Sequence, residues 1–222
     1  MCFVRGRYLG FVANSNAPLL SSNNVQRSFI SGVVSPKMFD RNDIHYIKRF
    51  KDTELNKNHF KKIVNEVKKN KFYSICTPFD ENSVDLLSDL KIDIIKIASC
   101  SFNDWFLLEK IVTKNKPIIA STAGASEQQI DNVVSFLKNR NKKFALMHCV
   151  AEYPTLNKKL NLNRLGFLIN KYKNIQVGYS THEDPKEINN IAVAIGMGAT
   201  IFEKHIGLST NKYVLNKYSA IL

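Results

Sequence analysis

Six short apolar runs recur along the chain, and each ends at a small polar residue or a histidine. Their polar ends fall at positions 77, 99, 121, 148, 180 and 205, so successive ends are 22 to 32 residues apart. One strand, one helix and two short loops fit this spacing, which predicts repeated βα units and a parallel sheet. The predicted strands are 72–77, 94–99, 117–121, 144–148, 175–180 and 200–205.

Helical patterns separate these runs and carry clear start signals. Apolar residues at helical spacing predict an amphipathic helix over 58–69. Side chains suited to capping precede the later helices, which are predicted over 84–90, 105–112, 127–138 and from 185 onward. The capping candidates are Asp80, Asn82 and Ser83, then Asn103 or Asp104, then Ser126 with Gln129 in a capping box, and Asp184 followed by Pro185.

Six parallel strands fit either an open doubly wound sheet or most of a barrel. An open sheet concentrates its site at one switch point, whereas a barrel directs every strand end toward one pocket. Polar groups at all six ends therefore favour a (β/α)₈ TIM barrel. At 222 residues the chain is short for that fold, which typically needs about 250. We therefore expect a barrel that is incomplete or has a divergent N-terminus.

The N-terminal segment breaks the βα rhythm. The runs 9–13 and 29–34 could be strands, but an Asn- and Ser-rich loop rather than a helix separates them. We therefore expect a divergent segment over 1–34, followed by a single barrel domain over 35–222 that supplies strands three to eight. No apolar run approaches the roughly 20 residues of a membrane span, and no secretory signal is recognisable. These features predict a cytoplasmic protein without a membrane partner.

Charge and cysteine content narrow the function classes. The net charge of +13 fits nucleic-acid binding, a lysine-rich solvated surface, or a field that attracts small anions. The lysines are dispersed and lack interleaved aromatic residues, which favours the second and third interpretations. Four cysteines without a C-x-x-C pair indicate buried thiols in a reducing compartment.

Two histidines follow consecutive predicted strands. His182 comes just after the fifth run and His205 ends the sixth. Neighbouring strands lie about 4.8 Å apart, so both imidazoles can reach one metal ion, although either could instead be a hydrogen-bonded structural residue. Two such ligands would suit a catalytic ion with open positions.

Residues with hydroxyl groups, and one lysine, lie at or near the ends of the other predicted strands. Each hydroxyl alone could be a loop cap, but the set suits a phosphate or carboxylate, with the lysine directed toward the same mouth. The sequence contains neither a P-loop nor a G-x-G-x-x-G motif, so a nucleotide ligand is not implied. The residues of this set are Thr77, Lys96, Ser99, Ser121, Thr122 and Ser180.

The pair His148 and Cys149 could suggest a thiolate with its base. Adjacent strand residues point to opposite faces, so a buried Cys149 is the favoured interpretation. Just beyond, Tyr153 lies in a loop segment that could cover a substrate.

Seven short motifs, in order and in spacing, resemble the N-acetylneuraminate (sialic acid) synthase family. The order and spacing of the chain match the family from about residue 57 to the C-terminus. The motifs are Thr77-Pro78-Phe79-Asp80, Lys96-Ile97-Ala98-Ser99, Ser121-Thr122, Leu146-Met147-His148-Cys149, Tyr153-Pro154-Thr155, Gly178-Tyr179-Ser180-Thr181-His182 and Glu203-Lys204-His205.

The resemblance implies a TIM barrel that condenses phosphoenolpyruvate with an N-acetylated hexosamine similar to N-acetylmannosamine. It implies a divalent metal, Mn²⁺ or Mg²⁺, held by His182 and His205, with Lys96 among the catalytic residues. Tyr153 would contact the sugar, and a homodimer is a further expectation. The phosphate would be bound by Thr77, Lys96, Ser99, Ser121 and Ser180.

The chain also departs from the family pattern. The family's first two strands, with their Glu and Lys-x-Gln, have no recognisable counterpart in 1–34, and we expect no antifreeze-like domain after the barrel. Ser101, Ala151 and Asn216 replace residues usual in the family, which points to a sugar other than N-acetylmannosamine. The alternatives are a catalytically impaired or non-catalytic homologue and, more remotely, a basic nucleic-acid-binding protein.

Overall fold

Six parallel strands form the centre of the molecule. A computed structural model describes residues 2–4, 8–10, 55–207 and 220–221. Each of the six strands pairs in parallel with the next along the chain, which confirms the predicted parallel α/β fold. The strands are β3 (Ile75–Cys76), β4 (Ile94–Ile97), β5 (Ile118–Ser121), β6 (Phe144–His148), β7 (Gln176–Thr181) and β8 (Ile201–Lys204).

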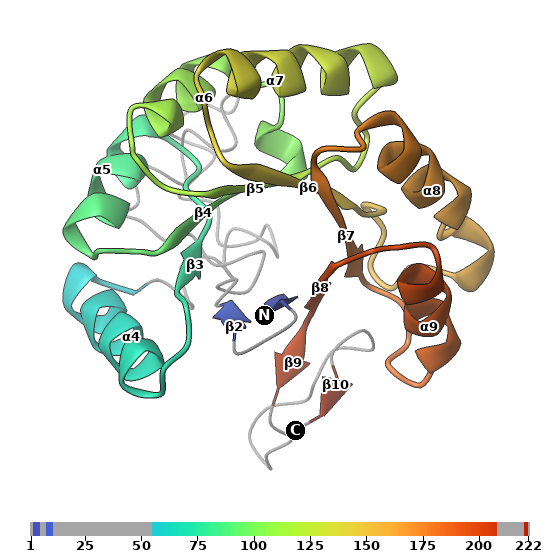
Figure 1. The fold of residues 1–222 in the computed structure, drawn as a ribbon. Coiled ribbons are helices and arrows are strands. Elements are labelled where there is room, and N and C mark those ends of the chain that lie inside the picture. The colour runs from blue at the N-terminus through green and yellow to red at the C-terminus, as the bar shows by residue number, and fades with distance from the viewer. Residues whose placement is uncertain (1, 5–7, 11–54, 208–219, 222) are drawn as a thin grey trace, which may run out of the picture.

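Helices form an arc outside these strands, so the sheet curls into an incomplete barrel (Figure 1). No helix in the described part of the chain has the length and apolar character needed to cross a membrane. The helices are α4 (Lys57–Lys69), α5 (Glu81–Asp89), α6 (Trp105–Val112), α7 (Glu127–Asn139), α8 (Leu162–Lys171) and α9 (Ile188–Gly196), with 3₁₀ turns η1 (Ser99–Ser101) and η2 (Asn157–Lys159).

Side-chain caps start three of the helices as predicted. Asp80 caps α5, Asp104 caps α6, and Ser126 forms the predicted capping box at α7. The cap predicted at Asp184 is wrong. Its carboxylate accepts a hydrogen bond from the backbone N–H of Lys186 at 2.9 Å, which closes a turn, and α9 starts only at Ile188 without a side-chain cap.

An N-terminal hairpin lies between the two ends of the curved sheet. Its strands β1 (Cys2–Val4) and β2 (Tyr8–Gly10) are antiparallel, and β1 also pairs antiparallel with β8. On its other side β2 lies close to β3 (Figure 1). The edge of β8 is therefore paired, although by a strand of the opposite direction to the other barrel strands. A small parallel pair, β9 (Ile206–Gly207) with β10 (Ala220–Ile221), follows β8.

Only part of the predicted N-terminal strand structure can be compared. The strand β2 overlaps the run predicted at 9–13, whereas the run 29–34 lies outside the described residues. The strand β1 was not predicted from the sequence, because three residues carry too little alternation to identify a strand.

Strict alternation separates the two faces of the sheet. On β6, Leu146 points outward into the large apolar cluster beneath the helices, whereas Ala145 and Met147 point inward to a smaller cluster. At Gly178 of β7, a Cβ atom would lie 2.5 Å from the carbonyl oxygen of Ile201 and 2.5 Å from the Met147 sulfur. Only glycine therefore allows β7 and β8 to approach each other here without displacing their neighbours.

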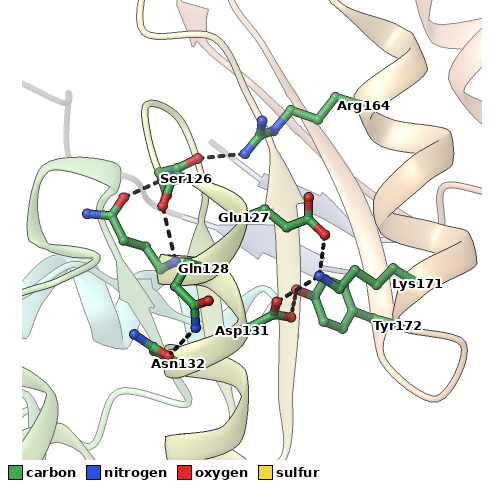
Figure 2. Close-up of polar contacts among 10 residues, drawn as sticks. Ser126, Glu127, Gln128, Asp131, Asn132, Arg164, Lys171 and Tyr172 are labelled. Atoms are coloured by element: carbon green, nitrogen blue, oxygen red, sulfur yellow. Dashed lines mark hydrogen bonds and ion pairs between the residues drawn. The ribbon is translucent and has the colours of Figure 1, made fainter.

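Polar contacts join α7 to α8 on the outer surface (Figure 2). The ammonium of Lys171 lies 2.6 Å from Glu127 and 2.7 Å from Asp131, and the hydroxyl of Tyr172 donates to Asp131 at 2.7 Å. Nearby, Arg164 donates to the carbonyl oxygen of Ala125 at 2.6 Å. This last bond connects α8 to the loop that follows β5, where the candidate site begins.

Candidate functional site

The inner face of the sheet becomes polar toward the carboxyl ends of its strands. On β5, Ile119 belongs to the inner apolar cluster, and Ser121, two residues later, lies on the same face. On β8 the same step leads from Ile201 to Glu203. The period of two thus places polar side chains above an apolar floor, at the strand ends where barrels carry their chemistry.

One cavity of about 110 Å³ lies at these strand ends. All eight residues that the sequence predicts as catalytic, substrate-binding or metal-binding line it, together with five residues that were not predicted as site residues. The predicted eight are Thr77, Lys96, Ser99, Ser121, Tyr153, Ser180, His182 and His205, and the others are Phe79, Ala98, Cys100, Cys149 and Glu203. The structure thus brings these residues together, while the role of each stays a prediction.

Two hydroxyl oxygens in the cavity wall lack a partner. Thr77 Oγ1 and Ser121 Oγ are buried and make no hydrogen bond in the described part of the chain. A buried polar atom without a partner is costly in free energy, so such atoms in a cavity indicate a ligand or water that completes them. Thr122, also considered from the sequence, is outside this set, because its hydroxyl donates to the carbonyl oxygen of Met147 at 3.1 Å.

A buried ion pair crosses the cavity. The ammonium of Lys96 on β4 contacts the carboxylate of Glu203 on β8, and both side chains are buried. Three strands separate β4 from β8 in the sheet, which would place them about 19 Å apart if the sheet were flat. The contact therefore depends on the curvature of the barrel. Burial acts to raise the pKa of Glu203, but Lys96 overcomes this effect and the pKa is lowered to about 2.

Sequence reasoning missed Glu203 as a site residue. It appears in one of the seven motifs, two residues before His205, and it is the acidic residue of an otherwise apolar run. The period of two would have placed it on the same face as His205, so a usable signal was present.

The two predicted metal-binding histidines lie next to each other. The ring centroids of His182 and His205 are 5.3 Å apart. Nδ1 of His182 donates to the carbonyl oxygen of Val150 at 3.2 Å, a tautomer that places the lone pair on Nε2. Burial lowers the pKa of His182 to about 4 and that of His205 to about 3. Both rings are therefore neutral at pH 7.

This pair fits a divalent metal ion as a partial ligand set. Metal binding requires neutral imidazoles, and a backbone carbonyl that accepts from the second ring nitrogen is the usual orienting contact. Within residues 55–207, no group of three or more His, Cys, Asp or Glu side chains is arranged to hold a metal. Substrate oxygens or water would have to complete the coordination.

The loop after β6 carries Tyr153 to the cavity. Its ring centroid lies 4.2 Å from that of His182, and 47% of the residue is exposed. The backbone N–H of Thr155 donates to the carbonyl oxygen of His182 at 2.9 Å, so the loop is bonded directly to the end of β7. An aromatic ring at the open side of a cavity suits contact with a sugar ring.

The pair His148 and Cys149 divides between the two faces, as predicted. His148 points outward, and its Nε2 lies 2.9 Å from the carbonyl oxygen of Leu160. Cys149 is buried in the cavity wall, and burial raises the pKa of its thiol to about 11. The prediction of a buried Cys149 is confirmed, and its raised pKa disfavours the thiolate, which is the nucleophilic form.

Comparison with known proteins identifies the family. The NeuB family profile matches residues 27–220. N,N'-diacetyllegionaminic acid synthase of Campylobacter jejuni is 36% identical over 173 residues, which cover 77% of this chain and 51% of that protein. The chain belongs to the NeuB family. The resemblance drawn from the seven motifs is thereby confirmed, and the matched NeuB region starts earlier than those motifs.

Solved structures agree with this assignment. A protein of Chromobacterium violaceum named for spore coat polysaccharide biosynthesis has a TM-score of 0.83 and 42% identity, covering 97% of this chain and 69% of that one. The N-acetylneuraminic acid synthetase of Leptospira borgpetersenii, solved with citrate, has a TM-score of 0.76 and 27% identity, covering 97% and 77%. The NeuB-type TIM-barrel fold is therefore shown. The chain spans about half the length of the curated relatives it matches.

The three positions that differ from the usual NeuB residues fall in different places. Ser101 is buried in the turn η1, and Ala151 is exposed in the loop that carries Tyr153. Asn216 lies outside the described residues. Neither Ser101 nor Ala151 is part of the cavity lining, although both are close in sequence to residues that are.

Proposed function

We propose that this chain condenses phosphoenolpyruvate with an N-acetylated hexosamine to give a sialic-acid-type nonulosonate and inorganic phosphate. The observation that carries the proposal is the single cavity that combines a lysine and buried hydroxyls with two neutral imidazoles. The first group suits an anion and the second suits a metal ion. Membership of the NeuB family supports the same class of reaction.

The phosphate half of the cavity would consist of Lys96 and the surrounding hydroxyls. Lys96 supplies the positive charge, and the orphaned Thr77 and Ser121 oxygens supply hydrogen bonds that the ligand-free protein does not use. Ser99 and Ser180 would add further donors from the neighbouring strand ends. Such a set binds phosphate without a P-loop and accounts for the unsatisfied hydroxyls.

His182 and His205 would hold a divalent ion, Mn²⁺ or Mg²⁺. When bound, the ion would supply Lewis acidity toward the aldehyde of the open-chain sugar. The hydrogen bond from His182 to Val150 fixes the ring so that Nε2 keeps its lone pair. Tyr153 would cover the sugar from the open side of the cavity.

The proposed reaction forms one carbon–carbon bond. The enol carbon attacks the sugar aldehyde, which leaves an alkoxide on the sugar and a cationic centre at the carbon bearing the phosphate. Water adds to this centre, and its proton passes to the alkoxide. Cleavage of the bond between this carbon and the phosphate oxygen then releases phosphate, and the new hydroxyl gives its proton to the departing phosphate to become a keto group. Lys96 would remain with the phosphate throughout and neutralise part of its charge.

The acceptor would be an acetamido sugar related to N-acetylmannosamine. Ala151 stands two residues before Tyr153, where the NeuB pattern has an asparagine, so this position offers no side-chain amide to the sugar. The matched relatives include a diacetyllegionaminic acid synthase, which supports testing diacetylated sugars among the first candidates.

Phosphate release tests the proposal. The protein is incubated with phosphoenolpyruvate, Mn²⁺ and a panel of acetamido sugars, and inorganic phosphate is measured. We expect turnover with at least one sugar, abolished by chelation and reduced at least about 1,000-fold in His182→Ala. His59→Ala, which changes an exposed histidine on α4, is the matched control and should retain full activity. Absence of turnover with every sugar would favour a non-catalytic homologue.

A further inference from the structure

Glu203 has no place in the roles proposed so far, although it lines the same cavity. It is 3% exposed and comes from the last strand of the sheet, in register with Ser180. A carboxylate beside a predicted phosphate site is unexpected, because it repels the anion that the site would bind. Its presence therefore requires a function that offsets this repulsion.

The two carboxylate oxygens of Glu203 have different environments. One accepts a hydrogen bond from Lys96, which keeps the carboxylate ionised and holds the ammonium on the cavity side of β4. The other, Oε2, is buried and has no hydrogen-bond partner among the residues that the structure describes. Glu203 is thus a fixed negative charge with one acceptor oxygen unused by the protein.

The proposed reaction creates a need for such a charge. Attack by the enol carbon leaves a positive charge on the carbon that bears the phosphate, before water adds to it. A preorganised, buried anion stabilises that charge more than it affects the uncharged enol carbon of the reactant, so it lowers the barrier of the chemical step. The same anion weakens binding of the phosphate group in the ground state.

We infer that Glu203 is a further catalytic residue, whose carboxylate stabilises the cationic centre and limits the affinity for phosphoenolpyruvate. The inference rests on the proposed function for the identity of that centre. The charge of Glu203 would weaken binding of phosphoenolpyruvate and at the same time speed the chemical step. A purely structural residue would not show these opposite effects. The Lys96 contact keeps the carboxylate in position for both effects.

Glu203→Gln tests the inference, because the amide keeps the shape and can still accept from Lys96 while removing the charge. Steady-state kinetics should show kcat lowered by about 100-fold. Calorimetry with phosphoenolpyruvate and Mn²⁺, without sugar, should show a Kd lowered by about tenfold. Glu203→Asp, which retains the charge, should restore part of kcat. Glu109→Gln, a change on the exposed face of α6, should match the unmodified protein in both measurements.

Each outcome bears on the inference separately from the proposed function. If the unmodified protein turns over and Glu203→Gln has an unchanged kcat, the inference is wrong and the function stands. Weaker binding of phosphoenolpyruvate by Glu203→Gln would also overturn it, because the residue would then only hold Lys96. If the unmodified protein has no turnover, the proposed function fails. If Glu203→Gln does not fold, Glu203→Asp must bind phosphoenolpyruvate with near-normal Kd and retain more than about a tenth of kcat.

Discussion

The outer face of the β3–β8 sheet is mostly apolar, with His148 as a polar residue at the end of β6, whereas its inner face changes from apolar to polar toward the carboxyl ends of the strands. Both faces come from the same alternating residues. On β4, Ile95 and Ile97 join the outer cluster beneath the helices, while Lys96 between them faces the cavity. Alternate residues of one strand therefore contribute to the packing under the helices and to the site.

This difference separates stability from chemistry. The outer cluster is large and continuous over all six helices, so most of the hydrophobic stabilisation lies there. Among the described residues, the inner apolar cluster contains five buried side chains, and above it lie an ion pair, imidazoles and hydroxyls without a hydrogen-bond partner in that part of the chain. Changes on the outer face should mainly alter the free energy of unfolding, and changes on the inner face should mainly alter binding and turnover.

The largest expected effect on stability comes from the outer cluster. Leu108 on α6 is completely buried, so Leu108→Ala removes packed methyl groups and leaves a cavity. We expect the free energy of unfolding to fall by about 2–5 kcal/mol in urea titration. Phe106→Ala, two residues earlier and 82% exposed in the native protein, is the control and should change it by less than about 1 kcal/mol. An equal loss in both variants would refute the assignment of stability to this face.

An effect of similar size is expected from pH, and it arises on the inner face. The pKa values of His182 and His205 are lowered by burial to about 4 and about 3, below the unfolded value of about 6.5. Between the folded and unfolded pKa values, the unfolded chain binds more protons than the folded one. The contribution of these histidines to the free energy of unfolding is therefore fully present above about pH 6.5 and decreases as the pH falls. The metal-free protein should lose about 4 kcal/mol of unfolding free energy between pH 7 and pH 5.

The double variant His182→Gln with His205→Gln isolates this contribution. Its unfolding free energy should decrease less steeply than that of the unmodified protein over the same pH range. His59→Gln, on the exposed surface of α4, should leave the slope unchanged. Parallel slopes in the double variant and the unmodified protein would show that the buried imidazoles do not cause the pH dependence.

The smallest effect is expected on the surface that joins α7 and α8. Lys171 contacts Glu127 and Asp131 there, and these hydrogen bonds hold the pKa of Lys171 above its usual value (Figure 2). Exposed ion pairs contribute little, so Lys171→Met should lower the melting temperature by no more than about 4 °C, without changing phosphate release. If Lys171→Met lowered the melting temperature by more than Leu108→Ala does in the same assay, the ranking of the two regions would be reversed.

Local signals explain which parts of the fold could be predicted from sequence. The runs ending at Ser121 and His148 correspond to strands whose ends match to the residue, and Ser126 forms the expected capping box. These features depend on neighbours within a few positions. The start of α9 could not be predicted, because Asp184 competes by closing a turn with Lys186.

Contacts between distant segments explain which parts of the fold and the site could not be predicted from the sequence. Lys96 and Glu203 are 107 residues apart in the sequence, so no local pattern reveals that they form a pair. The hairpin β1–β2 is held against β8 by backbone pairing, which depends little on side-chain identity. The positions of the site residues could be predicted because every parallel strand presents its carboxyl end to the same edge. The charge balance among them could not.

The Lys96–Glu203 pair also places the cavity late in the folding of the chain. Its two partners meet only after β5, β6 and β7 have assembled between them and the sheet has curled. During synthesis on the ribosome, Lys96 must wait until residue 203 has emerged, and long-range contacts of this kind form slowly. The outer cluster can form helix by helix as the chain lengthens. The cavity reaches its final charge state only when the last strand docks, so a chain interrupted before β8 could be compact and still have an incomplete site.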